Sequence, residues 1–245
     1  MPLSFPGLVG HRGAALRAPE NTLAAFRAAA AEGAGAVELD AKLTADGVVI
    51  CFHDDRLERT TDGHGPVATA SWPAIAGLDA GAWKAPAFAG TRVPTLAAAL
   101  AEIAALGLAV NVEIKPCPGR EAATAAATIA VIRSHWLAGR PIIVSSFAEE
   151  CLAVARDGAP GLPRGYLAER LPPDWMERAA ALGCAAIHPG HRGLDAGLCR
   201  AVTAAGFLLA AWTVNDPARA RELVAWGVDA VITDDPAGLA SALRR

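Results

Sequence analysis

The sequence predicts an α/β protein with the TIM (β/α)8 barrel fold, formed by a single domain over residues 1–245. A length of 245 residues with 53% hydrophobic side chains suits one domain of this size with a large core. Short apolar runs alternate eight times with alanine-rich helical stretches. Many of these stretches end, as helix C-caps do, at a glycine just before the next strand: Gly33, Gly107, Gly183, Gly206 and Gly227.

The expected elements follow one another as strand and helix along the whole chain. The short apolar runs predict strands over residues 8–11, 36–43, 109–115, 142–145, 164–167, 185–188, 208–214 and 230–233. The alanine-rich stretches predict helices near residues 22–32, 96–106, 121–135, 148–157, 173–182, 196–205, 217–226 and 236–243. An open doubly wound sheet is the alternative, but no G-x-G-x-x-G turn follows a strand here.

One segment interrupts this alternation. About forty residues, 54–93, separate the second strand from its helix, whereas a βα loop usually has about 2–6 residues. Trp72, Trp83 and Phe88 indicate an ordered insertion with its own apolar cluster. In a barrel it is expected to lie over the C-terminal face, where active sites form. The alternative is a packed loop without a role in the site.

Acidic side chains alternate with apolar ones on the second and third strands. Successive strand residues point to opposite faces, so Glu38 and Asp40 share the inner face of the barrel. On the third strand Asn111, Glu113 and Lys115 share it in the same way. Two neighbouring strands therefore direct three carboxylates toward one place.

Such a cluster needs compensation, because two carboxylates about 4 Å apart repel by about 4 kcal/mol at an effective dielectric near 20. Either a cation neutralises the group or one carboxyl keeps its proton. Oxygen-only ligands favour a hard divalent ion, Mg²⁺ or Ca²⁺, over zinc. The alternative is a structural network in which the acids pair with Arg or Lys.

Two histidines are expected beside these acids. Asp46-Gly47 between apolar residues predicts a hairpin with a two-residue loop, which returns His53 to a position opposite Asp40. His11 ends the first strand and faces the same end of the barrel. A pair of imidazoles next to a metal can act as general acid and general base.

Four further residues have candidate roles. Arg12 and Lys115 supply donors for a phosphate group. Asn21 either caps the following helix or contacts a ligand. Trp212, near the end of the seventh strand, forms either a pocket wall or part of the core. The other histidines lack acidic neighbours and are expected to be structural or exposed: His64, His135, His188 and His191.

The composition excludes several classes of partner. A net charge of −3 gives no general reason to expect nucleic acid or an anionic membrane. The best candidate for a membrane span, residues 96–112, carries Glu102, Gly107 and Asn111, so it indicates a helix running into a strand instead. Five cysteines without a C-x-x-C pair predict reduced thiols. No signal peptide is evident, so a cytoplasmic protein is expected.

Short motifs, each weak alone, follow one another from residue 11 to residue 234. They are His11-Arg12-Gly13, Pro19-Glu20-Asn21-Thr22, Glu38-Leu39-Asp40, Thr44-Ala45-Asp46-Gly47, His53-Asp54, Arg59-Thr60-Thr61, Glu113-Ile114-Lys115, Trp212-Thr213-Val214-Asn215, Gly227-Val228-Asp229 and Ile232-Thr233-Asp234. The series resembles the glycerophosphodiester phosphodiesterase family, in particular its cytoplasmic bacterial-type branch.

The resemblance implies a TIM barrel with a small insertion after the second strand. It also implies a divalent metal ion, Mg²⁺ or Ca²⁺, held by Glu38, Asp40 and Glu113. His11 and His53 match the catalytic acid/base pair of the family.

The implied activity is hydrolysis of a glycerophosphodiester to sn-glycerol 3-phosphate and an alcohol, through a cyclic phosphate. Arg12 and Lys115 match the phosphate contacts of the family, and Trp212 matches a residue on the glycerol side of the pocket. The expected partner is thus a small molecule, with neither nucleic acid nor stable membrane insertion. Two alternatives remain at this point: a related barrel phosphodiesterase acting on lysophospholipids or phosphoinositides, and a non-catalytic phosphate-binding barrel.

Overall fold

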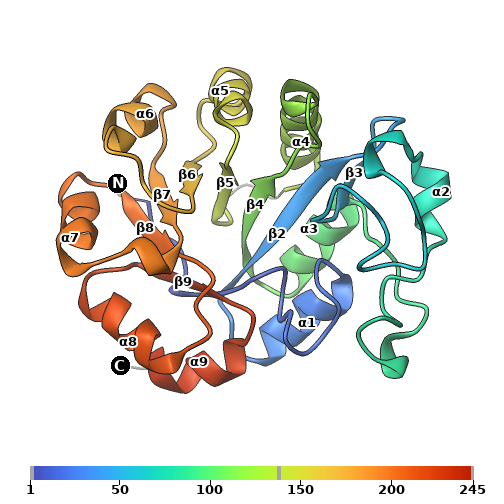
Figure 1. Cartoon of the computed structure of the whole chain (residues 1–245), viewed down its shortest axis with the longest axis horizontal. Coiled ribbons are helices and arrows are strands. Elements are labelled where there is room, and N and C mark those ends of the chain that lie inside the picture. Colours follow the sequence, from blue (N-terminus) through green and yellow to red (C-terminus); the bar gives the residue numbers. More distant parts are fainter. Residues whose placement is uncertain (1–2, 137–138, 244–245) are drawn as a thin grey trace.

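Eight parallel strands close into a barrel in the computed structural model, which describes residues 3–136 and 139–243 (Figure 1). The barrel strands are β1 (Leu8–Gly10), β2 (Ala36–Leu43), β4 (Ala109–Ile114), β5 (Ile142–Ser146), β6 (Arg164–Ala168), β7 (Ala186–Pro189), β8 (Leu208–Ala211) and β9 (Ala230–Thr233). Each strand pairs with the next along the chain, and β1 pairs with both β2 and β9, which closes the sheet. The predicted TIM barrel is confirmed.

Helices surround this barrel and follow its strands along the chain (Figure 1). They are α1 (Leu23–Ala31), α2 (Trp72–Ala76), α3 (Leu96–Ala105), α4 (Glu121–His135), α5 (Glu149–Gly158), α6 (Trp175–Ala181), α7 (Ala196–Ala204), α8 (Pro217–Ala225) and α9 (Pro236–Leu243). The five glycines predicted to end helices all have positive φ, between 61° and 96°. Each glycine directly follows the C-cap residue of its helix and ends it in the left-handed conformation that favours glycine, so the helix ends are where the sequence predicted them.

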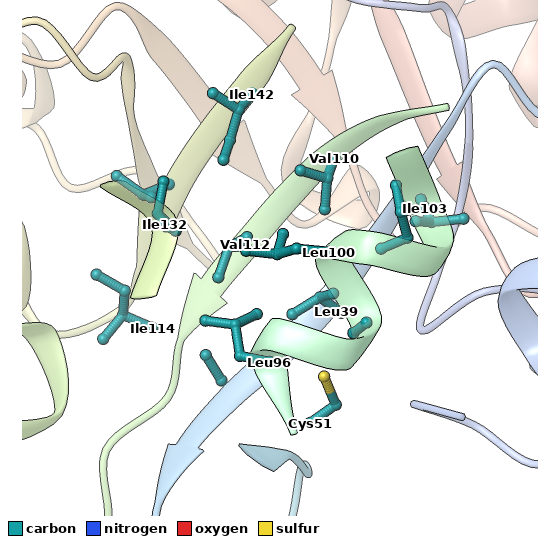
Figure 2. Close-up of a cluster of buried hydrophobic side chains, with 14 of the residues drawn as sticks. Leu39, Cys51, Leu96, Leu100, Ile103, Val110, Val112, Ile114, Ile132 and Ile142 are labelled. Carbon is teal, nitrogen blue, oxygen red and sulfur yellow. The ribbon is translucent and has the colours of Figure 1, made fainter. Parts of the chain in front are cut away.

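The main core lies between the strands and the helices. Leu39 of β2 and Val112 of β4 point outward and pack against Leu96 and Leu100 of α3 (Figure 2). Residues of the opposite parity point into the barrel, where small and branched side chains form a second cluster. This alternation leaves the inward positions near the strand ends for polar groups.

A hairpin extends β2 beyond the barrel. Strand β3 (Val49–Cys51) pairs with it antiparallel, and the Thr44 amide donates to the Val48 carbonyl at 3.0 Å. The loop therefore has three residues, 45–47, and the predicted two-residue loop is wrong. Gly47 adopts φ +87°, and the extra residue is accommodated in this left-handed conformation.

The longer loop shifts the hairpin register by one residue. Phe52 lies opposite Asp40 and donates to its carbonyl at 2.9 Å, whereas His53 was expected there. His53 follows directly, so it still reaches the end of the barrel. The predicted seventh strand is also shorter than expected and ends at Ala211, and Trp212 beyond it forms only an isolated bridge to Gly190.

Between β3 and α3 lies the long segment identified from the sequence. It contains α2 and two short 3-10 helices, Val67–Thr69 and Pro86–Phe88. Its apolar side chains pack with β3 and with Cys117, which follows β4, in a separate cluster: Ile50, Phe52, Leu57, Val67, Ile75, Ala80, Val93 and Cys117. Lys84 donates to the Ala15 carbonyl at 2.7 Å, which joins this segment to the β1–α1 connection.

Candidate active site

Three carboxylates meet inside the carboxyl end of the barrel. Glu38 and Asp40 point inward from β2, and the sheet register places Glu113 of β4 directly beside Asp40. All three are buried, and one oxygen of each lies within 4.8 Å of the others. The convergence predicted from strand alternation is therefore present.

Burial is the largest influence on the pKa of each of these acids. It raises the pKa of Glu38, which the charges of Asp40 and Glu113 raise further. It also raises the pKa of Glu113 to about 7, with Asp40 adding to the increase. For Asp40 the cations of Arg12 and Lys115 outweigh burial and lower the pKa to about 2. The positive charges of Arg12 and Lys115 thus do not fully compensate the negative charge of the three carboxylates.

His11 stands beside this cluster and is oriented by a carboxylate of its own. Its Nδ1 lies 2.7 Å from Oδ1 of Asp234, and its Nε2 lies 4.0 Å from Glu38. The Asn215 amide donates to the other oxygen of Asp234 at 2.7 Å and fixes that carboxylate. Because an ionised carboxylate only accepts, the shared proton is on Nδ1, and Nε2 is left on the side of the ring toward Glu38.

His53 repeats the same arrangement from the other side. Its Nδ1 lies 2.6 Å from Oδ1 of Asp54, and Arg59 holds that carboxylate through two donors at 2.6 and 2.9 Å. Burial lowers the pKa of the His53 imidazole, although the Asp40 charge acts in the opposite direction. His53 is therefore neutral at pH 7 and presents Nε2 as a base.

Arg12 is held at the acid cluster through both its backbone and its side chain. Its amide donates to Glu38 at 2.9 Å, and its guanidinium donates to Glu20 at 2.7 Å and lies 3.2 Å from Asp40. These carboxylates raise the pKa of Arg12 although burial opposes them. The guanidinium of Arg12 is thus held in place, with one edge against Glu20 and Asp40.

Lys115 is the second cation of the site. Its Nζ lies 2.7 Å from Glu113 and 3.6 Å from Asp40, and both charges raise its pKa against the effect of burial. The alternative considered from the sequence, in which the acids pair with Arg or Lys, therefore describes part of the arrangement. Two cations do not neutralise three acids, so pairing alone does not account for the cluster.

The β1–α1 connection is strained where it contacts the acids. Arg12 (φ +51°) and Asn21 (φ +56°) are the non-glycine residues with positive φ in the described part of the chain. Asn21 donates to Asp40 at 2.7 Å and accepts from the Asp40 amide at 3.0 Å. Thr22, not Asn21, caps α1 by accepting from Ala25. Strained backbone of this kind is typical of functional sites.

These residues line a cavity of about 260 Å³ with two unlike walls. The lining residues are His11, Arg12, Glu38, His53, Asn111, Glu113, Lys115, Phe147, Leu167, Trp212 and Ile232. Phe147 and Trp212 meet edge to face with ring centroids 5.5 Å apart. The cavity therefore presents charge on one side and an apolar surface on the other.

The structure brings the eight residues singled out from the sequence to one place. Seven line the cavity, and Asp40 is buried directly behind it. Sequence reasoning missed the apolar wall formed with Trp212 by Phe147, Leu167 and Ile232, as well as the carboxylates that orient the histidines. Of these, Asp54 directly follows His53 in the sequence, so its proximity alone could have found it.

One histidine outside the cavity is unusual. His188 of β7 is fully buried, and neither ring nitrogen has a hydrogen-bond partner among residues 3–136 and 139–243. A Cβ on Gly165 of β6 would lie 2.8 Å from its Nε2, so the imidazole occupies the space that this glycine leaves. Burial lowers the pKa of His188 to about 4, which keeps it neutral at pH 7.

Comparison with known families identifies the chain. The model of the glycerophosphoryl diester phosphodiesterase family matches residues 11–238. The chain belongs to this family. The family resemblance drawn from the short motifs is thereby confirmed.

Similar members of the glycerophosphoryl diester phosphodiesterase family cover nearly the whole chain. A glycerophosphodiester phosphodiesterase of Caldanaerobacter subterraneus is 34% identical over 97% of this chain and 98% of its own length. An Oleispira antarctica phosphodiesterase, solved in complex with the product sn-glycerol-3-phosphate, superposes with a TM-score of 0.95 and 38% identity over 98% of this chain and 97% of its own. A glycerophosphodiester phosphodiesterase structure from Agrobacterium tumefaciens has a TM-score of 0.81 and 31% identity, covering 97% of this chain and 100% of its own.

Two further properties of this family member follow from its structure. Glu38, Asp40 and Glu113 form a site that can hold a metal ion. No helix within the described ranges is both long and apolar enough to cross a membrane.

Proposed function

We propose that this chain hydrolyses glycerophosphodiesters to sn-glycerol 3-phosphate and an alcohol. The observation that carries the proposal is a single cavity that gathers two histidines, two carboxylates and two cations, with the third carboxylate, Asp40, buried directly behind it. The complex of the Oleispira antarctica relative with sn-glycerol-3-phosphate supports the identity of one product.

The carboxylates fit a hard divalent cation, and we take Mg²⁺ or Ca²⁺ as the cofactor. Oδ1 of Asp40 is buried without a hydrogen-bond partner among the described residues, and the donor set consists of carboxylate oxygens. Glu38, Asp40 and Glu113 would hold the ion. When bound, it would withdraw negative charge from the phosphoryl oxygens.

The two walls of the cavity position the diester. Arg12 and Lys115 donate to the non-bridging oxygens of the phosphate, where charge-assisted hydrogen bonds are strongest. The glycerol carbons lie against Trp212 on the apolar wall. This places the glycerol 2-hydroxyl next to the phosphorus and within reach of the imidazoles.

The imidazoles carry the proton transfers. Nε2 of one histidine accepts the proton of the glycerol 2-hydroxyl as its oxygen attacks phosphorus, and the bond from phosphorus to the head-group oxygen breaks. The other histidine, protonated, gives its proton to that leaving oxygen. The products are the alcohol and a cyclic phosphate, which water opens with the histidine roles reversed. Attack by a neighbouring hydroxyl needs no second molecule to be positioned, so its entropic advantage is large.

Phosphorus NMR tests this function directly. With glycerophosphocholine and Mg²⁺, we expect the diester signal to be replaced by that of glycerol 3-phosphate, and an excess of EDTA should stop the conversion. Activity confined to lysophospholipids would show the related phosphodiesterase instead. Binding of phosphate without any conversion would show a non-catalytic barrel.

We also propose that the insertion, residues 54–93, lies over the C-terminal face and forms one side of the active-site entrance. The contact of Lys84 with the Ala15 carbonyl supports this, because residue 15 lies in the connection that follows β1. Deleting this contact with Lys84→Met should raise KM for the diester more than it lowers kcat. An unchanged KM would speak against the assignment.

A cytoplasmic location completes the proposal. The five cysteines are all free in the structure, and four of them are buried. Unpaired buried thiols suit a reducing compartment. Fractionation of cells that express the protein, followed by detection with an antibody, tests the location.

A further inference from the structure

A second cavity adjoins the reaction cavity across Trp212. It has a volume of about 220 Å³ and is lined by Glu169, Gly190, His191, Arg192, Trp212 and Thr213. Another cavity shares His53 with the reaction cavity, but it measures only about 10 Å³ and holds no more than a single water molecule. The groove beyond Trp212, in contrast, is large enough for a substituent of the phosphate.

Trp212 forms a fixed partition between the two cavities. Its indole Nε1 donates to the His188 carbonyl at 2.9 Å, and its own carbonyl accepts from the His191 amide at 2.8 Å. Phe147 packs edge to face against it from the reaction cavity. The ring is thus held in place, with the reaction cavity on one side and the groove on the other.

The groove carries two opposite charges. Glu169 follows β6 and Arg192 follows β7, both are exposed, and neither forms an ion pair among residues 3–136 and 139–243. A Cβ on Gly190 would lie 2.7 Å from the Glu169 carbonyl oxygen and 3.2 Å from its carboxylate, so the glycine lets Glu169 lie directly against the β7 end of the groove. His191 adds a ring nitrogen, Nδ1, that is buried without a partner. An ammonium group matches the carboxylate, and an anionic group matches the guanidinium.

We propose that this groove binds the alcohol head group of the substrate, and that its charges select a head group carrying both an ammonium and a carboxylate, as in a serine diester. The inference rests on the proposed function. The phosphate lies at Arg12 and Lys115 in the reaction cavity, and its other substituent, the head group, passes over the edge of the Trp212 ring into the groove. There Glu169 attracts the ammonium, and Arg192 attracts the carboxylate.

Substitutions that remove one charge of the groove should change kcat/KM differently for different head groups. Glu169→Gln and Arg192→Gln should each lower kcat/KM for glycerophosphoserine about two- to fivefold, the range for exposed charge pairs. With glycerophosphoethanolamine, Glu169→Gln should lower kcat/KM and Arg192→Gln should raise it by a similar factor. With glycerophosphoglycerol, whose head group is uncharged, neither variant should change it.

Glu177→Gln, an exposed charge on α6 outside the groove, is the matched control and should leave all three substrates unaffected. Equal effects of a groove variant on all three substrates, or no effect on any, would overturn the head-group site while leaving the hydrolytic function in place. A wild-type protein that cleaves none of the three diesters would instead overturn the proposed function itself.

Discussion

Each imidazole of the reaction cavity has its own carboxylate, although the two pairs are made very differently. Asp54 is the next residue after His53, whereas Asp234 is 223 positions away from His11. In both pairs the carboxylate fixes a proton on Nδ1 and so sets the orientation of the ring. The two imidazoles are therefore oriented in the same way, by one carboxylate each.

Removing either imidazole should abolish most of the turnover. We expect His11→Ala and His53→Ala each to lower kcat about 10²- to 10⁴-fold, because general acid–base groups contribute rates of that order. Circular dichroism should show an intact fold in both. His135→Ala, at an exposed position on α4, is the control and should keep full activity. Near-normal turnover in either cavity variant would refute the assigned pair.

The orienting carboxylates should affect turnover more than substrate binding. Asp54→Asn and Asp234→Asn leave the side-chain shape intact but weaken the preference for a proton on Nδ1, and we expect kcat to fall about 10- to 100-fold. KM should change little, because neither carboxylate lines the cavity. Steady-state kinetics on a glycerophosphodiester checks this, and a change confined to KM would contradict it.

The buried His188 should make stability depend on pH. Its pKa is about 6.5 when unfolded and about 4 in the folded protein, because burial disfavours the charged ring. Between these values the unfolded state binds more protons, so stability falls as the pH decreases from about 6.5 to about 4, by about 3 kcal/mol in total.

Urea unfolding at pH 7 and pH 4.5 of the wild type and of His188→Gln measures this contribution. The variant should lose less stability on acidification, and other titrating groups cancel in the comparison. Equal losses in the two proteins would show that His188 is protonated in the folded state.

At the scale of single residues, the sequence predicted the site correctly where the position of a side chain follows from the alternation of residues along a strand. Glu38 and Asp40 share a face because they are two residues apart, and that requires no knowledge of tertiary structure. It failed where a contact depends on the tertiary path of the chain. Nothing near Phe147 indicates that its ring meets Trp212, and the partnership of Asp234 with His11 exists only in the closed barrel.

Among the secondary-structure elements, the turn after β1 is the most constrained. Gly13 has φ +86°, and a Cβ there would lie 2.5 Å from the backbone carbon of Ala25 in α1. The turn that carries His11 and Arg12 is thus packed directly on the first helix.

Gly13→Ala should therefore destabilise the protein strongly. The left-handed conformation costs an alanine about 1–2 kcal/mol, and the clash with α1 adds about 1–3 kcal/mol. Gly33→Ala is the matched control, since φ is again +86° but nothing lies within 4 Å of the new Cβ. It should lower the free energy of unfolding only by the conformational cost of about 1–2 kcal/mol. Denaturant unfolding checks both. Equal losses would show that α1 moves aside at no cost.

The β2–β3 hairpin shows how far sequence predicts an element. Asp46-Gly47 located the turn correctly, because glycine is favoured where φ is positive. The number of loop residues depends on further hydrogen bonds, here from the Val48 amide to the Thr44 hydroxyl at 3.0 Å. The register consequently differed by one residue, and His53 still reached the cavity because it follows the strand.

For the whole molecule, the eightfold alternation of strands and helices was sufficient to predict the fold. Closure requires that β1 meet both β2 and β9, and the size of the chain already favoured this arrangement. The insertion was predictable as an ordered segment, but its contacts with the β1–α1 connection were not, because they join residues 69 positions apart.

The charge imbalance of the acid cluster should be measurable in the stability of the whole protein. Burial and Asp40 raise the pKa of Glu113 from 4.5 to about 7, so above pH 7 its ionised form destabilises the metal-free fold. Glu113→Gln should therefore stabilise the protein in EDTA at pH 8 by about 3 kcal/mol. The same change removes a metal ligand.

Thermal unfolding in EDTA and in millimolar Mg²⁺ or Ca²⁺ separates the two effects. The wild type should gain melting temperature on addition of the ion, because a ligand that binds only the folded state stabilises it. The Glu113→Gln variant should start higher and gain little, while Glu177→Gln should behave as the wild type. A variant that gains as much as the wild type would exclude Glu113 as a ligand.

The pairing of β1 with β9 also governs when activity can arise during biosynthesis. His11 leaves the ribosome 223 residues before its carboxylate partner, Asp234, which lies just beyond β9. A nascent chain therefore carries both imidazoles and all three acids long before it can catalyse anything. Catalytic activity should therefore appear in a single step, once β9 has emerged from the exit tunnel and paired with β1.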